Sequence, residues 1–141
     1  MRTQHKSTHL ERRLNVRELP RNISFDGRSL FATLRIKLPQ YENPDSRGKR
    51  KPQPGYKFDR TEREIRREFD GYDFHGTSFR GLCKNERGEW EEDLNVWIEI
   101  DGEFDDARLR RLRVMKRRFK RRFKQWEIYM TLTPVIRLWA K

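Results

Sequence analysis

Polar and apolar residues alternate along several segments of this chain, and that alternation predicts strands. Residues 28–38, RSLFATLRIKL, place apolar side chains at every second position, which is the period of a half-buried strand. The same period predicts strands over 94–100 and 126–138. Residues 72–83 form a further predicted strand, which contains two glycines where an irregularity is expected.

Two segments instead repeat their apolar residues at steps of three and four, the period of one helix face. The first, 59–70, is a short helix of mixed charge in which Asp59 or Thr61 can act as the N-cap. The second spans 107–124 and carries an apolar stripe beneath a face made almost entirely of arginine and lysine. Its stripe consists of Leu112, Met115, Phe119, Phe123 and Trp126.

The remaining segments divide the chain into an arm, one domain and a long loop. Residues 1–27 form a basic arm with a short helix, because Thr8 and Glu11 fit a capping box. Residues 28–141 form a single domain, as the length of the chain suggests. Within it, residues 39–57 hold four prolines, a density that is expected to prevent regular structure.

The order strand, helix, strand, strand, helix, strand predicts an α+β domain of the ferredoxin-like, split βαβ type. We expect a four-stranded antiparallel sheet with two helices on one face and with the first and third strands in the centre. The apolar sides of the strands would then pack beneath the helices. The opposite face would expose an aromatic and basic set: Phe31, Arg35, Lys37, Trp97 and Tyr129.

Three short motifs mark this frame: F-D-G-Y at 69–72, G-E-W at 88–90 and K-Q-W-E-I-Y at 124–129. They resemble the F-G-G-[YF] helix end, the G-x-W turn and the Q-E-x-[VI]-Y strand of a loosely defined group of uncharacterised bacterial ferredoxin-like proteins. The resemblance covers roughly residues 30–132. This chain departs from the pattern at Asp70, which replaces a glycine, and at the inserted Trp126. The resemblance implies the fold and no established activity.

Charge is divided between two adjacent segments. Residues 86–106 hold ten acidic residues and one basic residue, whereas residues 107–124 hold eleven basic residues and no acidic one. The whole chain carries a formal net charge of +12. Asp105 and Asp106 would lie at the positive end of the helix dipole, which accounts for part of the acidic segment. The basic face exceeds what a dipole requires and indicates an anionic partner.

Nucleic acid, either RNA or single-stranded DNA, is the partner that these residues favour. Arginine dominates the helix, and its planar guanidinium suits phosphates and base stacking better than lysine does. The basic tip of the loop suits a phosphate clamp, and aromatic residues on central strands are where RNA-recognition modules stack bases. The candidate binding residues are Arg110, Arg111, Arg113, Arg117, Arg118, Arg121 and Arg122 on the helix, Arg47, Lys49, Arg50 and Lys51 in the loop, and Phe31, Arg35, Lys37 and Trp97 on the sheet.

Each of these surfaces also has an interpretation without nucleic acid. The acidic segment could meet the basic helix of a second copy and form an oligomer, or the two segments could neutralise each other within one chain. The aromatic sheet face could be a dimer interface or be covered by the arm. The loop at 39–57 could be a solvated insertion. A protein-protein interaction or oligomerisation subunit is therefore the first alternative function.

A nuclease is the second alternative. His75 is the only histidine of the predicted domain, and it could act with Tyr72 or Lys84 as a metal-independent acid or base, although a lone strand histidine is more often structural. The carboxylates within 101–106 could hold a divalent ion, yet they look more like a helix cap. No phosphate-binding glycine loop, nucleophile elbow or CxxC motif is present. We expect no catalytic residues, no metal and no cofactor.

The sequence therefore predicts a non-catalytic nucleic-acid-binding subunit of a larger ribonucleoprotein, mobile-element or defence assembly. Protein partners or self-association are expected beside the nucleic acid. A hydrophobic content of 33% allows only a modest core, and no apolar run is long enough to cross a membrane. The single Cys83 excludes an internal disulfide framework. A cytoplasmic protein without a membrane partner is expected.

Overall fold

The computed structural model describes residues 25, 27–84, 87–136 and 138, so the helix expected in the arm lies outside the described part. The elements follow the predicted order along the chain. They are β1 (Leu30–Pro39), α2 (Gly55–Glu68), β2 (Asp73–Lys84), β3 (Trp90–Phe104), α3 (Asp106–Arg122) and β4 (Tyr129–Pro134).

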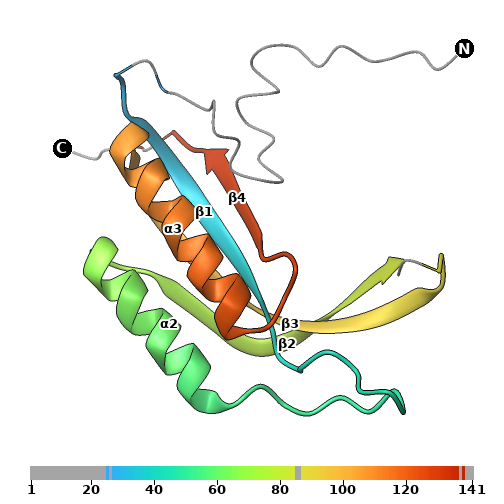
Figure 1. The fold of residues 1–141 in the computed structure, drawn as a ribbon. Helices are drawn as coiled ribbons and strands as arrows, with labels where there is room; N and C mark the ends of the chain where they lie inside the picture. Colours follow the sequence, from blue (N-terminus) through green and yellow to red (C-terminus); the bar gives the residue numbers. More distant parts are fainter. Residues whose placement is uncertain (1–24, 26, 85–86, 137, 139–141) are drawn as a thin grey trace, which may run out of the picture.

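The strands pair in the order β2-β3-β1-β4, and every pairing is antiparallel. The first and third strands are therefore central, as expected. Figure 1 shows α2 and α3 lying side by side over one face of the sheet, with the ends of β2 and β3 extending beyond the helices as a hairpin. An α+β fold with an antiparallel sheet and two helices is thus confirmed.

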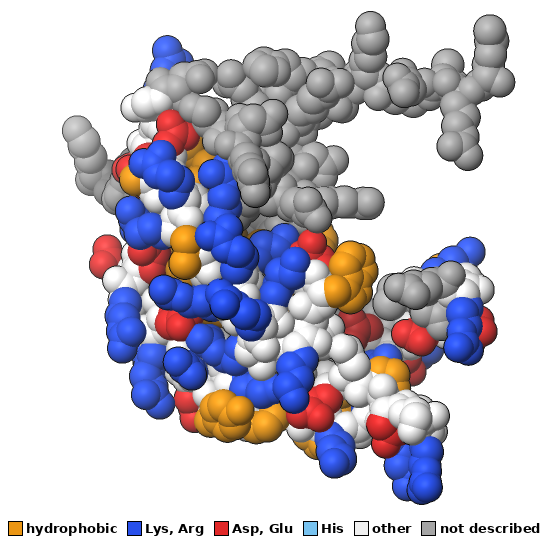
Figure 2. All heavy atoms as spheres, in the orientation of Figure 1, with side chains coloured by type: hydrophobic (Ala, Val, Ile, Leu, Met, Phe, Trp, Pro, Cys, Tyr) orange, Lys and Arg blue, Asp and Glu red, His pale blue; other side chains and the backbone are white. Residues whose placement is uncertain are grey.

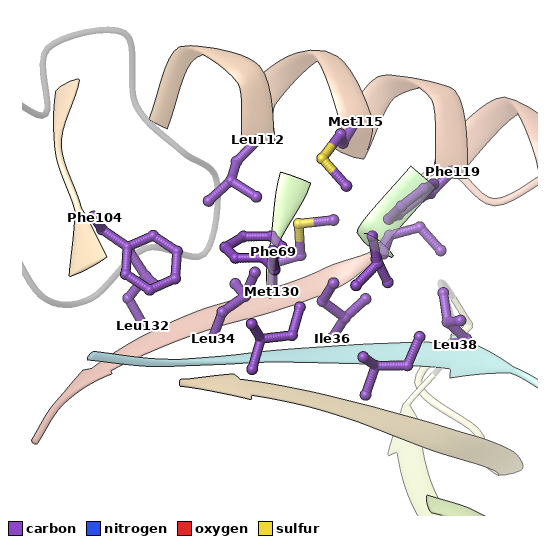
Figure 3. Close-up of a cluster of buried hydrophobic side chains, with 14 of the residues drawn as sticks. Leu34, Ile36, Leu38, Phe69, Phe104, Leu112, Met115, Phe119, Met130 and Leu132 are labelled. Atoms are coloured by element: carbon purple, nitrogen blue, oxygen red, sulfur yellow. The ribbon is translucent and has the colours of Figure 1, made fainter. Parts of the chain in front are cut away.

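The core lies between this sheet face and the two helices (Figure 3). The alternating residues of β1, from Ala32 to Leu38, are buried, and the α3 stripe packs on them. On β4, Met130 and Leu132 are buried while their neighbours are not, as the period of two predicts. The predicted helix stripe is buried at Leu112, Met115, Phe119 and Phe123, whereas Trp126 is 85% exposed.

Two strands have bounds that differ from the prediction. β3 extends to Phe104, four residues beyond the predicted end, and Leu30 of β1 pairs with Phe104. The acidic residues Asp101 and Glu103 are accommodated because they occupy exposed positions, while Phe104 is buried. β4 is shorter than the predicted strand of 126–138. The register of β2 against β3 shifts between His75 and Phe79, a stretch that contains one of the two glycines expected to be irregular.

The predicted cap of α2 is wrong. The helix begins at Gly55, its N-cap is Pro54, and no side chain caps it. Pro54 has a φ of −58°, so its ring already holds a backbone angle suited to the start of a helix. Thr61 is buried inside the helix instead, and its hydroxyl donates to the carbonyl of Lys57. The predicted loop of 39–57 therefore ends earlier.

The prolines of the loop do not prevent regular pairing. The Glu42 N–H donates to Lys51 O (2.7 Å) and the Gln53 N–H to Gln40 O (2.8 Å), which makes a short hairpin-like arrangement. Gln53 is buried, and its Nε2 donates to the carbonyl oxygen of Phe123 at 3.2 Å. The loop is therefore fastened to the C-terminal end of α3.

At the N-terminus of α3 the structure places the cap that the charge pattern indicated. Asp105 is the N-cap residue, and its carboxylate accepts a hydrogen bond from the Arg108 N–H at 2.8 Å. Replacing Asp105 with alanine should lower the free energy of unfolding by about 1 kcal/mol, because a first-turn N–H loses its acceptor. Urea unfolding measures the loss. Asp105→Ser should retain most of the stability, because serine can also cap a helix. A serine variant with a free energy of unfolding as low as that of the alanine variant would contradict the capping role.

Candidate nucleic-acid interface

Helix α3 presents three sides besides the one that packs on the sheet. With 3.6 residues per turn, the side opposite the buried stripe carries Arg110, Val114, Arg117 and Arg121, and all four are exposed. We call these four residues the α3 crest. One flank of the helix faces α2, and the other faces the segment that leads into β4.

The flank that faces α2 uses its arginines for structure. Arg122 Nη2 lies 2.7 Å from Glu64 Oε1, and Arg122 Nη1 donates to the Thr61 hydroxyl at 2.8 Å. Only 9% of the Arg122 side chain and 15% of the Glu64 side chain are exposed. Arg111 lies 2.8 Å from Glu68. Two of the seven predicted helix contacts, Arg111 and Arg122, are therefore engaged with glutamates of α2.

Glu68 joins α2 to two turns of α3 through Arg108 and Arg111. Arg108 Nε donates to Glu68 Oε1 at 3.1 Å, and its guanidinium lies 4.7 Å from the centre of the Phe69 ring. Burial by itself raises the pKa of Glu68, but hydrogen bonds and positive charge from Arg111 and Arg108 outweigh it and hold the pKa below 4.5. The hydrogen bond that Arg111 donates to Glu68 also raises the pKa of Arg111.

This lowered pKa makes stability depend on pH in a defined direction. A carboxylate with a lower pKa in the folded state stabilises the fold above its unfolded pKa, and the contribution disappears as pH falls through the folded pKa. Glu68→Gln should therefore be less stable than the wild type at neutral pH. The difference should shrink as pH falls from the ordinary pKa of a glutamate, about 4.3, through the lowered pKa of the folded state, because the wild-type carboxylate becomes protonated over that range. Urea unfolding across this range tests it, and a difference that stays constant down to acid pH would contradict it.

The opposite flank is partly buried. Lys116 is 7% exposed, and its Nζ lies 2.7 Å from Glu127 Oε1. Arg113 is also only partly exposed. This flank therefore contributes less free positive charge than the sequence pattern suggested.

The crest remains as the exposed basic surface of the helix. Among the described residues, Arg110, Arg117 and the adjacent Arg118 take part in no ion pair, and Arg121 Nε only reaches the carbonyl of Arg117 at 3.5 Å. Figure 2 shows lysine and arginine side chains gathered over α3 and α2 on this face of the molecule. The structure therefore brings together four of the seven predicted helix residues as one exposed, cationic surface.

The acidic segment before α3 has its own partners elsewhere. On β3, Glu99 lies 2.8 Å from Arg35 of β1, and Glu92 lies 3.5 Å from Arg80 of β2. Glu91 and Asp93 lie 3.8 Å and 3.9 Å from Arg50 of the loop. These carboxylates of β3 thus lie near arginines of β1, β2 and the loop rather than near the arginines of the α3 crest.

The sheet face opposite the helices is less open to bases than predicted. Lys37 pairs with both Trp97 and Tyr129 in the strand register, so the three share this face. Arg35 lies 4.9 Å from the centre of the Trp97 ring, and Lys37 lies 5.8 Å from it. Arg35 and Lys37 therefore lie beside the Trp97 ring, on which a base was predicted to stack. Phe31 is only partly exposed, and its cross-strand neighbour is the acidic Glu103.

The loop retains a basic tip, although one of its four candidates is engaged. Arg50 contacts carboxylates of β3 and donates to the carbonyl of Glu92 at 3.2 Å. Arg47, Lys49 and Lys51 are exposed. The carboxylate of Asp45 accepts the N–H groups of Arg47 and Lys49, so a tight turn presents these residues.

His75 is not grouped with the residues proposed to assist it. Its Nε2 lies 3.9 Å from Glu99, and its cross-strand neighbour is Trp97. The Tyr72 hydroxyl instead donates to Glu62 of α2, and burial together with this hydrogen bond raises its pKa. Lys84 pairs with Trp90 at the far end of β2. Neither Tyr72 nor Lys84 is therefore placed to act with His75.

Comparisons with known proteins find no match. No protein-family model fits the chain, and no curated protein or solved structure is significantly similar to it. Within the described residues, no cluster of three or more histidine, cysteine or acidic side chains could hold a metal ion. The helices among these residues are too short or too polar to cross a membrane.

Sequence reasoning missed a group of residues that meet where α2 begins and α3 ends. Tyr56 and Arg60 of α2 line a groove of about 770 Å³ together with Arg118, Arg121 and Lys124. Tyr56 was missed because α2 was expected to begin at Asp59, which left Tyr56 in a loop. The signal that could have found it is Pro54-Gly55, since proline is favoured at helix starts.

Proposed function

We propose that this chain is a non-catalytic nucleic-acid-binding subunit of a larger ribonucleoprotein, mobile-element or defence assembly. We infer further that its fold is ferredoxin-like, because the strand order β2-β3-β1-β4 with a helix after β1 and after β3 is that of the split βαβ arrangement. The α3 crest and Arg118 bind the phosphate backbone. The basic loop tip adds a second contact.

One observation carries this proposal. The arginines of the crest are exposed and form no ion pairs with described residues, whereas Arg111 and Arg122 on the α2-facing flank do. When exposed arginines neutralise phosphates, they release the cations condensed on the nucleic acid, and that release favours binding. The carboxylates of Glu91, Glu92, Asp93 and Glu99 on β3 lie near cations of the strands and the loop instead of the crest.

Binding by the wild-type protein tests the proposal. Fluorescence anisotropy with labelled single-stranded RNA, single-stranded DNA and duplex DNA should show binding that weakens as salt rises. The ratio of absorbance at 260 and 280 nm, read before any nuclease step, should show nucleic acid that copurifies with the protein. A clean protein ratio together with no binding at low salt would contradict the proposal.

Self-association is a second candidate, and one observation favours it. At the outer part of the β2–β3 hairpin, Leu82 is 56% exposed and Trp90 is 67% exposed. Apolar side chains presented on a projecting hairpin suit a protein partner. This candidate predicts that the protein oligomerises without nucleic acid, and that Trp90→Ser and Leu82→Ser abolish the oligomer. Sedimentation velocity of nuclease-treated protein distinguishes it from nucleic-acid binding, under which the treated protein is a monomer.

A further inference from the structure

The groove between the first turns of α2 and the last turn of α3 has an unbalanced charge. Lys57, Arg60, Arg118, Arg121, Arg122 and Lys124 line it, against the two carboxylates of Glu42 and Glu64. Glu64 is held by Arg122, and the Lys57 ammonium donates to Gln53 Oε1 at 3.0 Å. Arg60, Arg118, Arg121 and Lys124 are left as exposed cations around one hollow.

The backbone at the end of this groove forms the Schellman turn that ends α3, with Gln125 N–H donating to Lys120 O at 2.9 Å and Lys124 N–H to Arg121 O at 3.3 Å. Lys124 has a φ of 52°, the left-handed region that costs a non-glycine residue about 1 kcal/mol. Its carbonyl accepts a hydrogen bond from Asn43 Nδ2 at 3.0 Å, and Gln125 Nε2 donates to Asn43 Oδ1 at 3.0 Å. The loop and the end of α3 thus fix Lys124 at the groove.

An aromatic ring stands beside these cations. Tyr56 is 63% exposed, although it lies on the first turn of α2 and lines the groove. Unpaired bases stack on exposed aromatic rings, whereas the bases of a duplex are stacked on one another and are not accessible to such a ring. Cations and an aromatic ring around one hollow match the phosphate and the base of a single nucleotide unit.

We infer that this groove binds one nucleotide unit of a single strand, with its phosphate against Arg60, Arg118 and Lys124 and its base on Tyr56. The inference rests on the proposed function and deepens it. The crest supplies affinity for any phosphate backbone, and the groove makes the protein prefer single strands over duplexes. Arg121 lies at the junction of the crest and the groove.

The test compares groove and crest variants on two probes. A groove variant carries Tyr56→Ala and Arg60→Ala, and a crest variant carries Arg110→Ala and Arg117→Ala. The probes are labelled oligo(U) of about 12 nucleotides, within the site size of such domains, and an RNA duplex of the same length. The groove variant should lose about tenfold or more in affinity for oligo(U), with less than about a twofold loss on the duplex. The crest variant should weaken both.

Two further variants keep the test informative. Tyr56→Phe should bind oligo(U) like the wild type, because the ring remains, and Arg63→Ala, on an exposed position one turn further along α2, should change neither affinity. Wild-type binding by the groove variant, with weak binding by the crest variant, would overturn the groove and leave the proposed function standing. Equal losses on both probes would overturn the assignment of single-strand preference. Wild-type binding by both variants would overturn both the groove and the crest as contact surfaces, whereas no binding of either probe by the wild-type protein at low salt would overturn the proposed function itself.

Discussion

Reversing the charge of Arg110, Arg117 and Arg121 to glutamate should lower the affinity for nucleic acid by about 100-fold or more at low salt. Each substitution removes one contact that releases counterions and adds a charge that repels phosphate. The three side chains are exposed and are not used to hold the fold together, so the far-UV circular dichroism spectrum should not change. Anisotropy titrations with single-stranded RNA measure the loss.

A matched variant separates the position of the charge from its amount. Arg28, Arg80 and Lys84 are also exposed, and they lie outside α3, on β2 or just before β1. Reversing these three changes the net charge by the same amount and should weaken binding far less. If both triple variants bind equally weakly, net charge rather than the crest governs binding, and the assignment of the crest is wrong.

Replacing Arg122 with alanine should lower the free energy of unfolding by about 3 kcal/mol, because it leaves a buried carboxylate without its partner. Glu64 Oε2 is already buried without a hydrogen-bond partner among the described residues, and the substitution would strand Oε1 as well. The guanidinium also lies 5.4 Å from the centre of the Phe119 ring, so packing is lost with the charge. Urea unfolding at neutral pH measures the change.

Two further variants identify the cause of that loss of stability. Arg118→Ala, one turn earlier on the same helix and exposed, should change stability by less than about 0.5 kcal/mol. Arg122→Met combined with Glu64→Met should recover most of the stability, since two apolar side chains of similar volume can replace a buried ion pair. A double variant as unstable as Arg122→Ala would show that the ion pair itself is required.

The spacing of apolar residues along the sequence was sufficient to predict the order of helices and strands in the fold. The stripe from Leu112 to Phe123 and the alternation of β1 identified which sides are buried, because a period of 3.6 residues marks one face of a helix and a period of two marks one face of a strand. They also placed Lys37, Trp97 and Tyr129 on one sheet face, as the register shows. Local signals failed at α2, where Pro54-Gly55 begins the helix in place of a polar cap.

The candidate site could be predicted only in part, because the roles of the arginines depend on a second helix. Arg111, Arg118 and Arg122 share the flank facing α2, and the position of α2 decides which of them meets a glutamate. A signal was present in α2 itself, where Glu64 and Glu68 stand four residues apart on one side of the helix. Three basic residues of α3 pair with them, Arg108 and Arg111 with Glu68 and Arg122 with Glu64. The contact between the Arg35 guanidinium and the Trp97 ring could be predicted only once the register of β1 against β3 was known.

The salt dependence of binding tests the role of the α3 crest most directly. The logarithm of the binding constant for single-stranded RNA should fall linearly with the logarithm of the salt concentration. Reversing Arg110, Arg117 and Arg121 should reduce the magnitude of that slope by about 2, because each lost phosphate contact removes about 0.7. The matched variant at Arg28, Arg80 and Lys84 should keep the wild-type slope. A slope that is the same in the crest variant and the wild type would contradict phosphate binding by the crest.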